Sequence, residues 1–263
     1  MVTLSVTCIG CSKIEDDYNE DLQLKSTAPP MPNADYTKTW TENFQNQFAL
    51  NANWVLFGTP QPQWVAAAYG KSGLFNNHGP SPEKSYGVSV LPVGTGKGYT
   101  VEGEVMLKIR NPEGTCVCPG IAVSQDQNPV INKSNEIPTG LSMKLVYAGS
   151  EAIWFPAHVR MHTSFVMEFI SENENVVSSG YIPADVYSNS WHKLKIVVTS
   201  TRYVKFYCDN ELIWAPFNRI HPMMMSDKKV VLGYTSDGNS KNYAGRAYHD
   251  WVKVTYTVPP ETE

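Results

Sequence analysis

From Trp40 onward, the chain consists of short segments in which hydrophobic and polar residues alternate. This alternation is typical of β-strands, because successive side chains of a strand point to opposite faces of a sheet. Turns rich in Gly, Pro, Asn and Asp separate the segments, and no segment keeps a helical period that is capped at both ends. Strands are predicted at residues 86–91, 99–109, 141–147, 158–170, 191–199, 203–208, 211–214 and 229–234. The pattern predicts an all-β sandwich, or jelly roll, of two antiparallel sheets.

The last predicted strand, residues 247–254 (AYHDWVKV), contains an aspartate in its interior. Strict alternation places Asp250 on the same face as Val252 and Val254. Strand interiors disfavour Asp, and a buried carboxylate without a partner is costly. We therefore expect a specific partner for Asp250.

The chain begins with MVTLSVTCIGC, a short apolar run that ends at Cys11, and the acidic segment SKIEDDYNED follows. Residues 1–11 resemble the end of a bacterial lipoprotein signal, and the acidic residues after Cys11 resemble the surface-export signal of Bacteroidetes lipoproteins. The resemblance implies lipidation at Cys11 and a protein anchored to the cell outer membrane, or otherwise an extracellular or periplasmic one. A disordered leader with a chance cysteine is the alternative.

Residues 12–38 are polar, include PPMPNAD and have no hydrophobic period, which is typical of a flexible tether. Residues 39–258 are expected to form one domain, because all-β sandwiches of this length are often single domains. The segment has no fixed-period repeat that would indicate a propeller or a solenoid.

Composition narrows the classes of partner. The 263 residues carry a formal net charge of −4 and no cluster of Lys and Arg, which argues against nucleic acid. No apolar run approaches the roughly 20 residues of a membrane span, so contact with a membrane is expected only through a lipid anchor. Cys116 and Cys118 form a lone C-x-C without the second pair of a zinc site. Cys208 alternates with apolar residues and is interpreted as a small core residue.

Three segments resemble a known superfamily. WHKLKIVVTSTRYVKFYCDNELIW, residues 191–214, resembles a hairpin of the concanavalin A-like lectin/glucanase superfamily. AYHDWVKVTY and YTVEGEVMLKI are similar to the last strand and an earlier strand of laminarinase- and lichenase-type glycoside hydrolases of family 16. The resemblance covers roughly residues 40–257 and implies a concanavalin A-like β-sandwich, related to laminin-G-like and family 16 jelly rolls.

The resemblance implies a role for Asp250. In family 16 enzymes, an aspartate of the last strand helps to bind a structural calcium ion together with main-chain carbonyl groups. Asp250 stands at the matching position, and calcium prefers oxygen ligands, so Ca²⁺ is the expected cofactor. Hydrogen bonds from backbone N–H groups, or from Lys or Arg, are the alternative.

The resemblance also indicates where catalysis would occur. Family 16 enzymes carry two carboxylates on one strand, in E-x-D-x-x-E or a related spacing. The matching segment, residues 135–160, contains only Glu136 and Glu151 and no alternating acidic strand, so the catalytic residues of the family are missing. A second pair, Glu102 and Glu104, shares one face of a predicted strand and is interpreted as exposed strand acids.

A cluster of His158, Arg160 and His162 shares one face of a predicted strand. Imidazole and guanidinium groups donate hydrogen bonds to sugar hydroxyls or to a uronate, and Trp154 just upstream offers a ring for stacking. We therefore expect these four residues to bind the ligand. A solvated polar face and an ordinary edge aromatic are the alternatives.

Together these patterns predict a carbohydrate-binding, surface-exposed lipoprotein of a bacterial glycan-utilisation system that lacks the family 16 catalytic carboxylates. Its expected partner is a polysaccharide or oligosaccharide. The alternative is a glycoside hydrolase or polysaccharide lyase with a non-standard active site. A protein-binding module of the laminin-G type is a third hypothesis.

Overall fold

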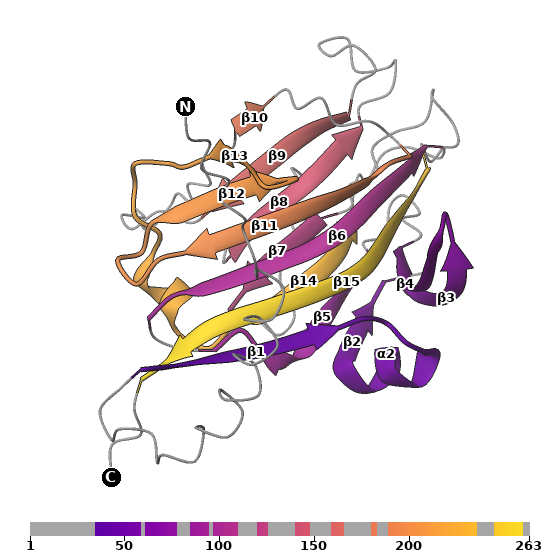
Figure 1. Ribbon diagram of the computed structural model, residues 1–263, viewed down its shortest axis with the longest axis horizontal. Coiled ribbons are helices and arrows are strands. Elements are labelled where there is room, and N and C mark those ends of the chain that lie inside the picture. Colours follow the sequence, from indigo (N-terminus) through magenta and orange to yellow (C-terminus); the bar gives the residue numbers. More distant parts are fainter. Residues whose placement is uncertain are drawn as a thin grey trace, which may run out of the picture. The chain divides into compact units, whose positions relative to one another are not determined.

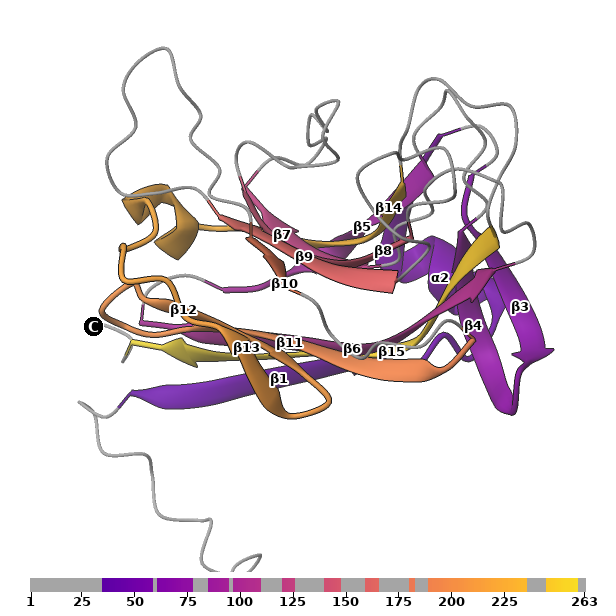
Figure 2. The same ribbon diagram turned by 90° about the horizontal axis from the view of Figure 1, so that it is seen from above.

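The structure is a computed structural model, and the residues that it describes are 35–58, 61–77, 85–94, 97–109, 120–125, 140–147, 159–165, 180–182, 189–235 and 245–259. Residues 36–259 form one compact unit. Its described strands make two antiparallel sheets, one of eight strands and one of seven, which lie face to face (Figure 1, Figure 2). We call the larger one the back sheet and the smaller one the front sheet. The all-β sandwich of two antiparallel sheets that the sequence predicts is confirmed.

The back sheet is centred on the long last strand. Its strands are β1 (Tyr36–Glu42), β3 (Gln63–Ala68), β4 (Lys71–Asn77), β6 (Tyr99–Ile109), β11 (Trp191–Val198), β12 (Val204–Cys208), β13 (Glu211–Trp214) and β15 (Gly245–Val258). Their spatial order is β13-β12-β11-β6-β15-β4-β3, and β1 also pairs with β15. Residues 247–249 of β15 pair with β4, and residues 252–258 pair with β1. Because β1 begins at Tyr36, the end of the segment predicted as a tether belongs to the sheet.

The front sheet runs, in spatial order, through β10 (Gly180–Ile182), β9 (Val159–Phe165), β8 (Gly140–Tyr147), β7 (Gly120–Ser124), β14 (Lys229–Thr235), β5 (Ser85–Pro92) and β2 (Trp54–Phe57). A short helix, α2 (Gln47–Asn53), precedes β2, and a 3-10 helix, η1 (Pro222–Met225), precedes β14. The Asn46 side chain caps α2 by accepting a hydrogen bond from Ala49 N at 2.8 Å. None of the helices among the described residues has the length and apolarity needed to cross a membrane.

Strand alternation places the hydrophobic core between the two sheets. In β11, Leu194, Ile196 and Val198 are buried, while the intervening residues are partly exposed on the outer face of the back sheet. Leu141 and Met143 of β8 meet them from the front sheet in the same cluster. Burial of each such side chain contributes roughly 1.5–3 kcal/mol, so this shared core holds the sheets together.

A hydrogen bond crosses the core between the sheets. His249 in β15 lies 3.1 Å, through Nε2, from Gly120 O in β7. Its ring stands edge-on to Phe75, with 5.3 Å between the centroids. Burial lowers the pKa of His249 to about 4. The ring is therefore neutral at pH 7, with Nε2 protonated as the donor to the carbonyl group.

Candidate functional site

The strand that contains Asp250 is interrupted by a β-bulge. The register between β15 and β6 shifts between His249 and Trp251, which leaves Asp250 as an extra residue. The bulge lies where the second neighbour of β15 changes from β4 to β1. A bulge interrupts the alternation of side chains. The prediction that Asp250 shares a face with Val252 and Val254 is therefore wrong, because those valines face the core and Asp250 does not.

Asp250 instead lies beside Lys71 on the outer face of the back sheet. Lys71 Nζ is 3.0 Å from Asp250 Oδ2 and 2.9 Å from Glu104 Oε2. Glu104 also accepts a hydrogen bond from Trp251 Nε1 at 3.0 Å. Burial raises the pKa of Asp250, and the hydrogen bond and charge of Lys71 oppose that rise. The hydrogen bond with Glu104 raises the pKa of Lys71. Lys71 therefore supplies the partner that a half-buried aspartate requires.

Calcium binding by Asp250 stays a prediction. The ammonium group of Lys71 lies within 3.0 Å of both Asp250 and Glu104, the place that a cation shared by these carboxylates would take. A calcium ion would have to displace the lysine and gather about six to eight oxygen ligands. A test of this prediction must therefore distinguish a bound metal ion from the ammonium group of Lys71 as the partner of Asp250.

The acidic pair of β6 lies on this same outer face. Lys193 Nζ is 2.9 Å from Glu102 Oε2, and Lys253 Nζ is 3.7 Å from Glu102 Oε1. Glu104 is paired with Lys71 as described above. Both carboxylates are thus compensated by lysines, which favours their interpretation as strand acids over a catalytic pair.

Among the described residues, a group of three potential metal ligands lies within 4.8 Å of one another, namely His192, Cys208 and Asp209. His192 Nδ1 is 2.7 Å from Asp209 Oδ2, and Asp209 Oδ1 accepts a hydrogen bond from Lys193 N at 2.8 Å. Burial raises the pKa of the Cys208 thiol to about 12. Cys208 is buried and its thiol lies 3.7 Å from Asp209 Oδ2, which fits a small core residue beside a hydrogen-bonded turn.

Two of the four predicted ligand residues have a described backbone. Arg160 and His162 lie two positions apart in β9, beside Val146 and Lys144 of β8. Trp154 and His158 lie outside the described residues. The structure therefore brings Arg160 and His162 together on one strand of the front sheet, next to a lysine.

Lys144 is a candidate site residue that the sequence analysis missed. Its neighbours in β8 face the core, so Lys144 belongs to the outward face of the front sheet, which we call the front face. Its side chain is only 2% exposed. In the register, Lys144 pairs with Gly120 in β7 and with His162 in β9, which in turn pairs with Tyr181 in β10. The alternation of polar and apolar residues in GLSMKLVY indicates the outward face of Lys144, but it does not indicate the pairing with His162.

Strands β7 to β10 combine cationic residues with a lack of carboxylates. Their sequences, GIAVS, GLSMKLVY, VRMHTSF and GYI, contain Lys144, Arg160 and His162 but neither Asp nor Glu. Glu136 and Glu151 lie outside the described residues. A glycosidase of the usual kind needs two carboxyl groups across the scissile bond, and these strand residues supply none.

The other half of the front face is apolar. Tyr86, Val88, Ala122 and Val231 form a separate buried cluster, and Phe57 stacks on Tyr86 with 4.9 Å between the ring centroids. The polarity of the front face therefore changes across the sheet, from β2, β5 and β14 to β8 and β9. Polar residues also occur beyond this cluster, because Lys229 of β14 shares the face of Val231 and pairs with Ser124 of β7.

Comparison with family models and with curated proteins finds no match to this chain. Solved structures do match its fold. Basic winged bean lectin with Tn-antigen has a TM-score of 0.54 and 10% identity, covering 86% of this chain and 100% of the lectin. Porphyranase B from Zobellia galactanivorans has a TM-score of 0.53 and 13% identity over 89% of this chain and 97% of that enzyme. Alginate lyase Aly36B has a TM-score of 0.55 and 11% identity over 85% and 98%.

These neighbours define the class of fold. The chain is a concanavalin A-like β-sandwich, as the hairpin of residues 191–214 and the last strand predict. The same fold occurs in lectins, in a porphyranase and in an alginate lyase. A shared fold does not fix a function, so the role has to be argued from the residues of the site.

Proposed function

We propose that this protein binds a carbohydrate on the polar half of its front face. The observation that carries the proposal is the row formed by Lys144, His162 and Tyr181, with Arg160 two residues from His162 in β9. Cationic and aromatic residues of these types donate hydrogen bonds to hydroxyl groups and stack on sugar rings. Trp154 and His158, which precede β9 in the chain, complete the proposed ligand-binding set.

The ligand that this face fits best is an acidic glycan. Lys144, Arg160 and His162 come from two adjacent strands, and β7 to β10 contribute no carboxylate. The back sheet differs, because lysines and carboxylates compensate one another on its outer face. A uronate or a sulfate group carries charge of the opposite sign to these residues, and arginine binds either group with two parallel hydrogen bonds.

The setting we propose is glycan capture at a bacterial cell surface. Lipidation at Cys11 would anchor the protein to the outer membrane, and the polar segment that follows would hold the sandwich away from the lipid. This part of the proposal is supported by the sequence alone, since residues 1–34 lie outside the described residues.

The second candidate function is a polysaccharide lyase. Elimination from a uronate needs a cation beside the carboxylate, a base that removes the C5 proton and an acid that protonates the leaving O4. The C5–H electrons form the C4=C5 double bond as the C4–O4 bond breaks. Residues of the required types, lysine, arginine, histidine and tyrosine, occur together on β8, β9 and β10. The lack of acidic residues in β7 to β10 favours a lyase over a two-carboxylate hydrolase.

A glycan array with product analysis tests both candidates. The array should contain neutral glycans, polyuronates and sulfated galactans, each at matched chain length. We expect retention of acidic glycans above neutral ones, with affinity that falls as salt is added, because salt screens charge. Products with a new double bond would establish the lyase, whereas equal retention of neutral glycans would overturn the acidic preference. No retention and no products would overturn the carbohydrate proposal.

A further inference from the structure

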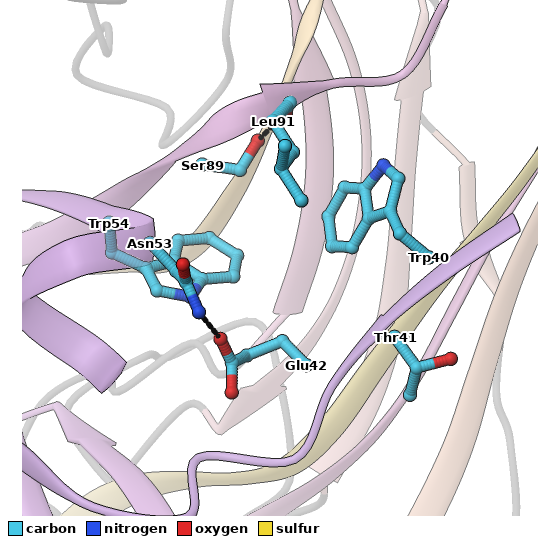
Figure 3. Close-up of a pocket in the computed structure, with 7 residues that line it drawn as sticks. All are labelled: Trp40, Thr41, Glu42, Asn53, Trp54, Ser89 and Leu91. Atoms are coloured by element: carbon cyan, nitrogen blue, oxygen red, sulfur yellow. Dashed lines mark hydrogen bonds between the residues drawn. The ribbon is translucent and has the colours of Figure 1, made fainter.

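A small pocket opens at the edge of the sandwich, where β1, α2, β2 and β5 meet (Figure 3). Its free volume is about 30 Å³. Because one water needs roughly 10–15 Å³, the pocket has room for about two waters and is too small for a sugar ring. Glu42 in its wall already accepts hydrogen bonds from Phe44 N at 2.8 Å and from Asn53 Nδ2 at 2.6 Å. A larger ligand therefore does not fit here, in contrast to the open outer face of the back sheet.

At one end of the outer face of the back sheet, two cations stand opposite one another, apart from the ion pairs described above. Arg246 in β15 pairs in register with Lys108 in β6. Both belong to the outer face, because their neighbours Ala247 and Leu107 lie in the core between the sheets. Directly opposite residues of antiparallel strands have Cβ atoms about 4.5–5.5 Å apart, so like charges in such a pair repel one another and destabilise the sheet.

Neither cation forms an ion pair with a carboxylate of the described residues. Glu104 is the nearer carboxylate of β6 and is paired with Lys71 at 2.9 Å, and it stands four residues from Lys108, roughly 13 Å along the strand. Glu102 lies further away and is paired with Lys193 at 2.9 Å. Both cations are partly buried, so salt screens their charges less than it screens charges on a fully exposed surface. The pair is therefore a local excess of positive charge.

Two tyrosines border this pair and orient it. Lys108 Nζ lies over the ring of Tyr69, 5.2 Å from its centroid. The ring of Tyr69 stands edge-on to that of Tyr248, with 5.2 Å between the centroids. Burial raises the pKa of Tyr248, and the hydrogen bond and positive charge of Arg246 oppose that rise. The tyrosine rings therefore hold the ammonium and guanidinium groups in the same corner of the sheet.

The chemistry of the pair suits a tetrahedral oxyanion. A guanidinium group binds two oxygen atoms of a sulfate or phosphate group through parallel hydrogen bonds. An ammonium group donates from a single point and reaches a further oxygen of the same group. A carboxylate has only two oxygens, so it would leave one of the two cations without an acceptor of its own.

We propose that Arg246 and Lys108 form a binding site for a sulfate or phosphate group on the outer face of the back sheet. Arg246 binds two oxygens of the group and Lys108 binds a third, and the anion removes the repulsion between the two cations. A free inorganic anion and a sulfate ester of a glycan are the two sources of such a group. The site belongs to the opposite sheet from Arg160 and does not depend on the function proposed for the front face.

The experiment follows the Nε–H resonance of Arg246 in the ¹⁵N-labelled protein while sodium phosphate or sodium sulfate is added at constant ionic strength. The resonance is assigned as the one missing from Arg246→Gln. We expect a saturable shift in the millimolar range with both anions, and little or no shift with chloride or acetate. Lys108→Gln should keep the resonance and weaken binding of both anions by about tenfold or more, because it removes a charged hydrogen bond.

Lys195→Gln is the matched control for Lys108→Gln. Lys195 also lies over a tyrosine ring of the back sheet, 5.6 Å from the centroid of Tyr207, but the residue opposite it in β6 is Glu102 rather than a cation. This variant should leave the phosphate titration unchanged. The proposal is overturned if the Arg246 shift follows ionic strength alone, if acetate acts as strongly as phosphate, or if Lys108→Gln does not weaken the response.

A sulfated galactan oligosaccharide identifies the source of the group. A shift of the Arg246 resonance at a lower concentration of this oligosaccharide than of inorganic sulfate assigns the site to a glycan, and the reverse order assigns it to a free anion. Arg160→Ala, which changes the front face, should leave the Arg246 shift unchanged. If neither the inorganic anions nor the oligosaccharide shift the Arg246 resonance while acidic glycans are still retained on the array, this site is overturned and the front-face proposal stands.

Discussion

Asp250 shows how two local features together determine the environment of one residue. The bulge turns its side chain away from the core, and Lys71 Nζ forms an ion pair with Asp250 Oδ2 at 3.0 Å. The carboxylate remains partly shielded, at 16% side-chain exposure, so it needs a partner more than a surface aspartate would. The aspartate that looked anomalous in the sequence is therefore explained by a lysine that is distant in sequence.

We expect Lys71 and Asp250 to be energetically coupled. A double-mutant cycle with Lys71→Met and Asp250→Asn, measured by denaturant unfolding, should give a coupling free energy of about 0.5–1 kcal/mol, the range of partly exposed ion pairs. The matched control is a cycle with Lys253→Met and Asp250→Asn. Its coupling free energy should be smaller, because Lys253 Nζ lies beside another carboxylate, 3.7 Å from Glu102 Oε1. Additive effects at Lys71 and Asp250 would contradict the pairing.

The calcium proposal makes a different prediction for Asp250. If the ion is bound, a chelator should lower the melting temperature by several degrees, because a ligand of the folded state contributes about 2.7 kcal/mol at a hundred times its dissociation constant. Asp250→Ala should then abolish the effect of the chelator. An unchanged melting temperature, with no metal found by elemental analysis, would leave Lys71 as the partner.

His249 should make folding sensitive to acid. Burial lowers its pKa from 6.5 to about 4, so the unfolded chain binds the proton more tightly than the folded protein. Stability is therefore complete above pH 6.5, declines as the pH falls, and is lower by about 3 kcal/mol below pH 4. Urea unfolding at a series of pH values measures this slope.

His249→Gln is the informative variant, because an amide keeps a donor for Gly120 O and does not titrate. It should flatten the dependence of the unfolding free energy on pH between 6.5 and 4. The control is His221→Gln, which changes a histidine outside the core and should retain the slope. A slope that persists in His249→Gln would assign the acid sensitivity to other groups.

At the level of strands, β9 carries the proposed binding chemistry. Arg160 lies in the interior of β9, opposite Val146. If Arg160 binds an acidic group of the glycan, Arg160→Ala should weaken binding about tenfold or more, since removal of a charged hydrogen bond costs roughly 1.5–3 kcal/mol. Calorimetric titration with a glycan from the array measures the loss.

The matched control is Lys195→Ala on the back sheet, which removes one positive charge from the opposite side of the sandwich. Binding should be unaffected in this variant. Melting temperatures of both variants should remain near that of the wild type. Unaltered affinity together with a large loss of stability in Arg160→Ala would show that the arginine is structural.

The sequence predicted those strands whose alternation is regular. In β11, buried and partly exposed residues alternate without interruption, and the predicted segment 191–199 matches it. β3 shows no such regularity, because an edge strand with the sequence QWVAAA buries neither face fully. Helix α2, with seven residues, is too short to display a helical period. Edge position alone does not explain the misses, because β13, an edge strand of the back sheet, was predicted at residues 211–214.

The candidate site was only partly predictable for related reasons. Arg160 and His162 were found because they repeat at strand spacing. Lys144 was missed because its importance comes from its pairing with His162. The register between two strands cannot be predicted from the sequence of either strand alone. The bulge at Asp250 was missed because it arises where β15 changes partners.

At the scale of the whole molecule, the fold is shared by proteins of several different activities. A lectin, a porphyranase and an alginate lyase all cover more than four fifths of this chain, each at 13% identity or less. Such a shared sandwich leaves the ligand to be determined by the residues displayed on its surface. For this protein, the proposal of an acidic glycan rests on Lys144, Arg160 and His162 in β8 and β9.

The proposed location of the molecule at a membrane depends on lipidation of Cys11. The apolar run that ends at this residue and the acidic segment after it imply a lipid attached to the cysteine. Labelled palmitate fed to the native bacterium should therefore enter the wild-type protein and not Cys11→Ala. Cys8→Ala is the matched control, because Cys8 lies within the proposed signal and should not affect labelling. Acyl chains contribute about 0.8 kcal/mol per buried CH₂ group, so Cys11→Ala should also leave the membrane fraction. Equal label in wild type and Cys11→Ala would exclude lipidation at this residue.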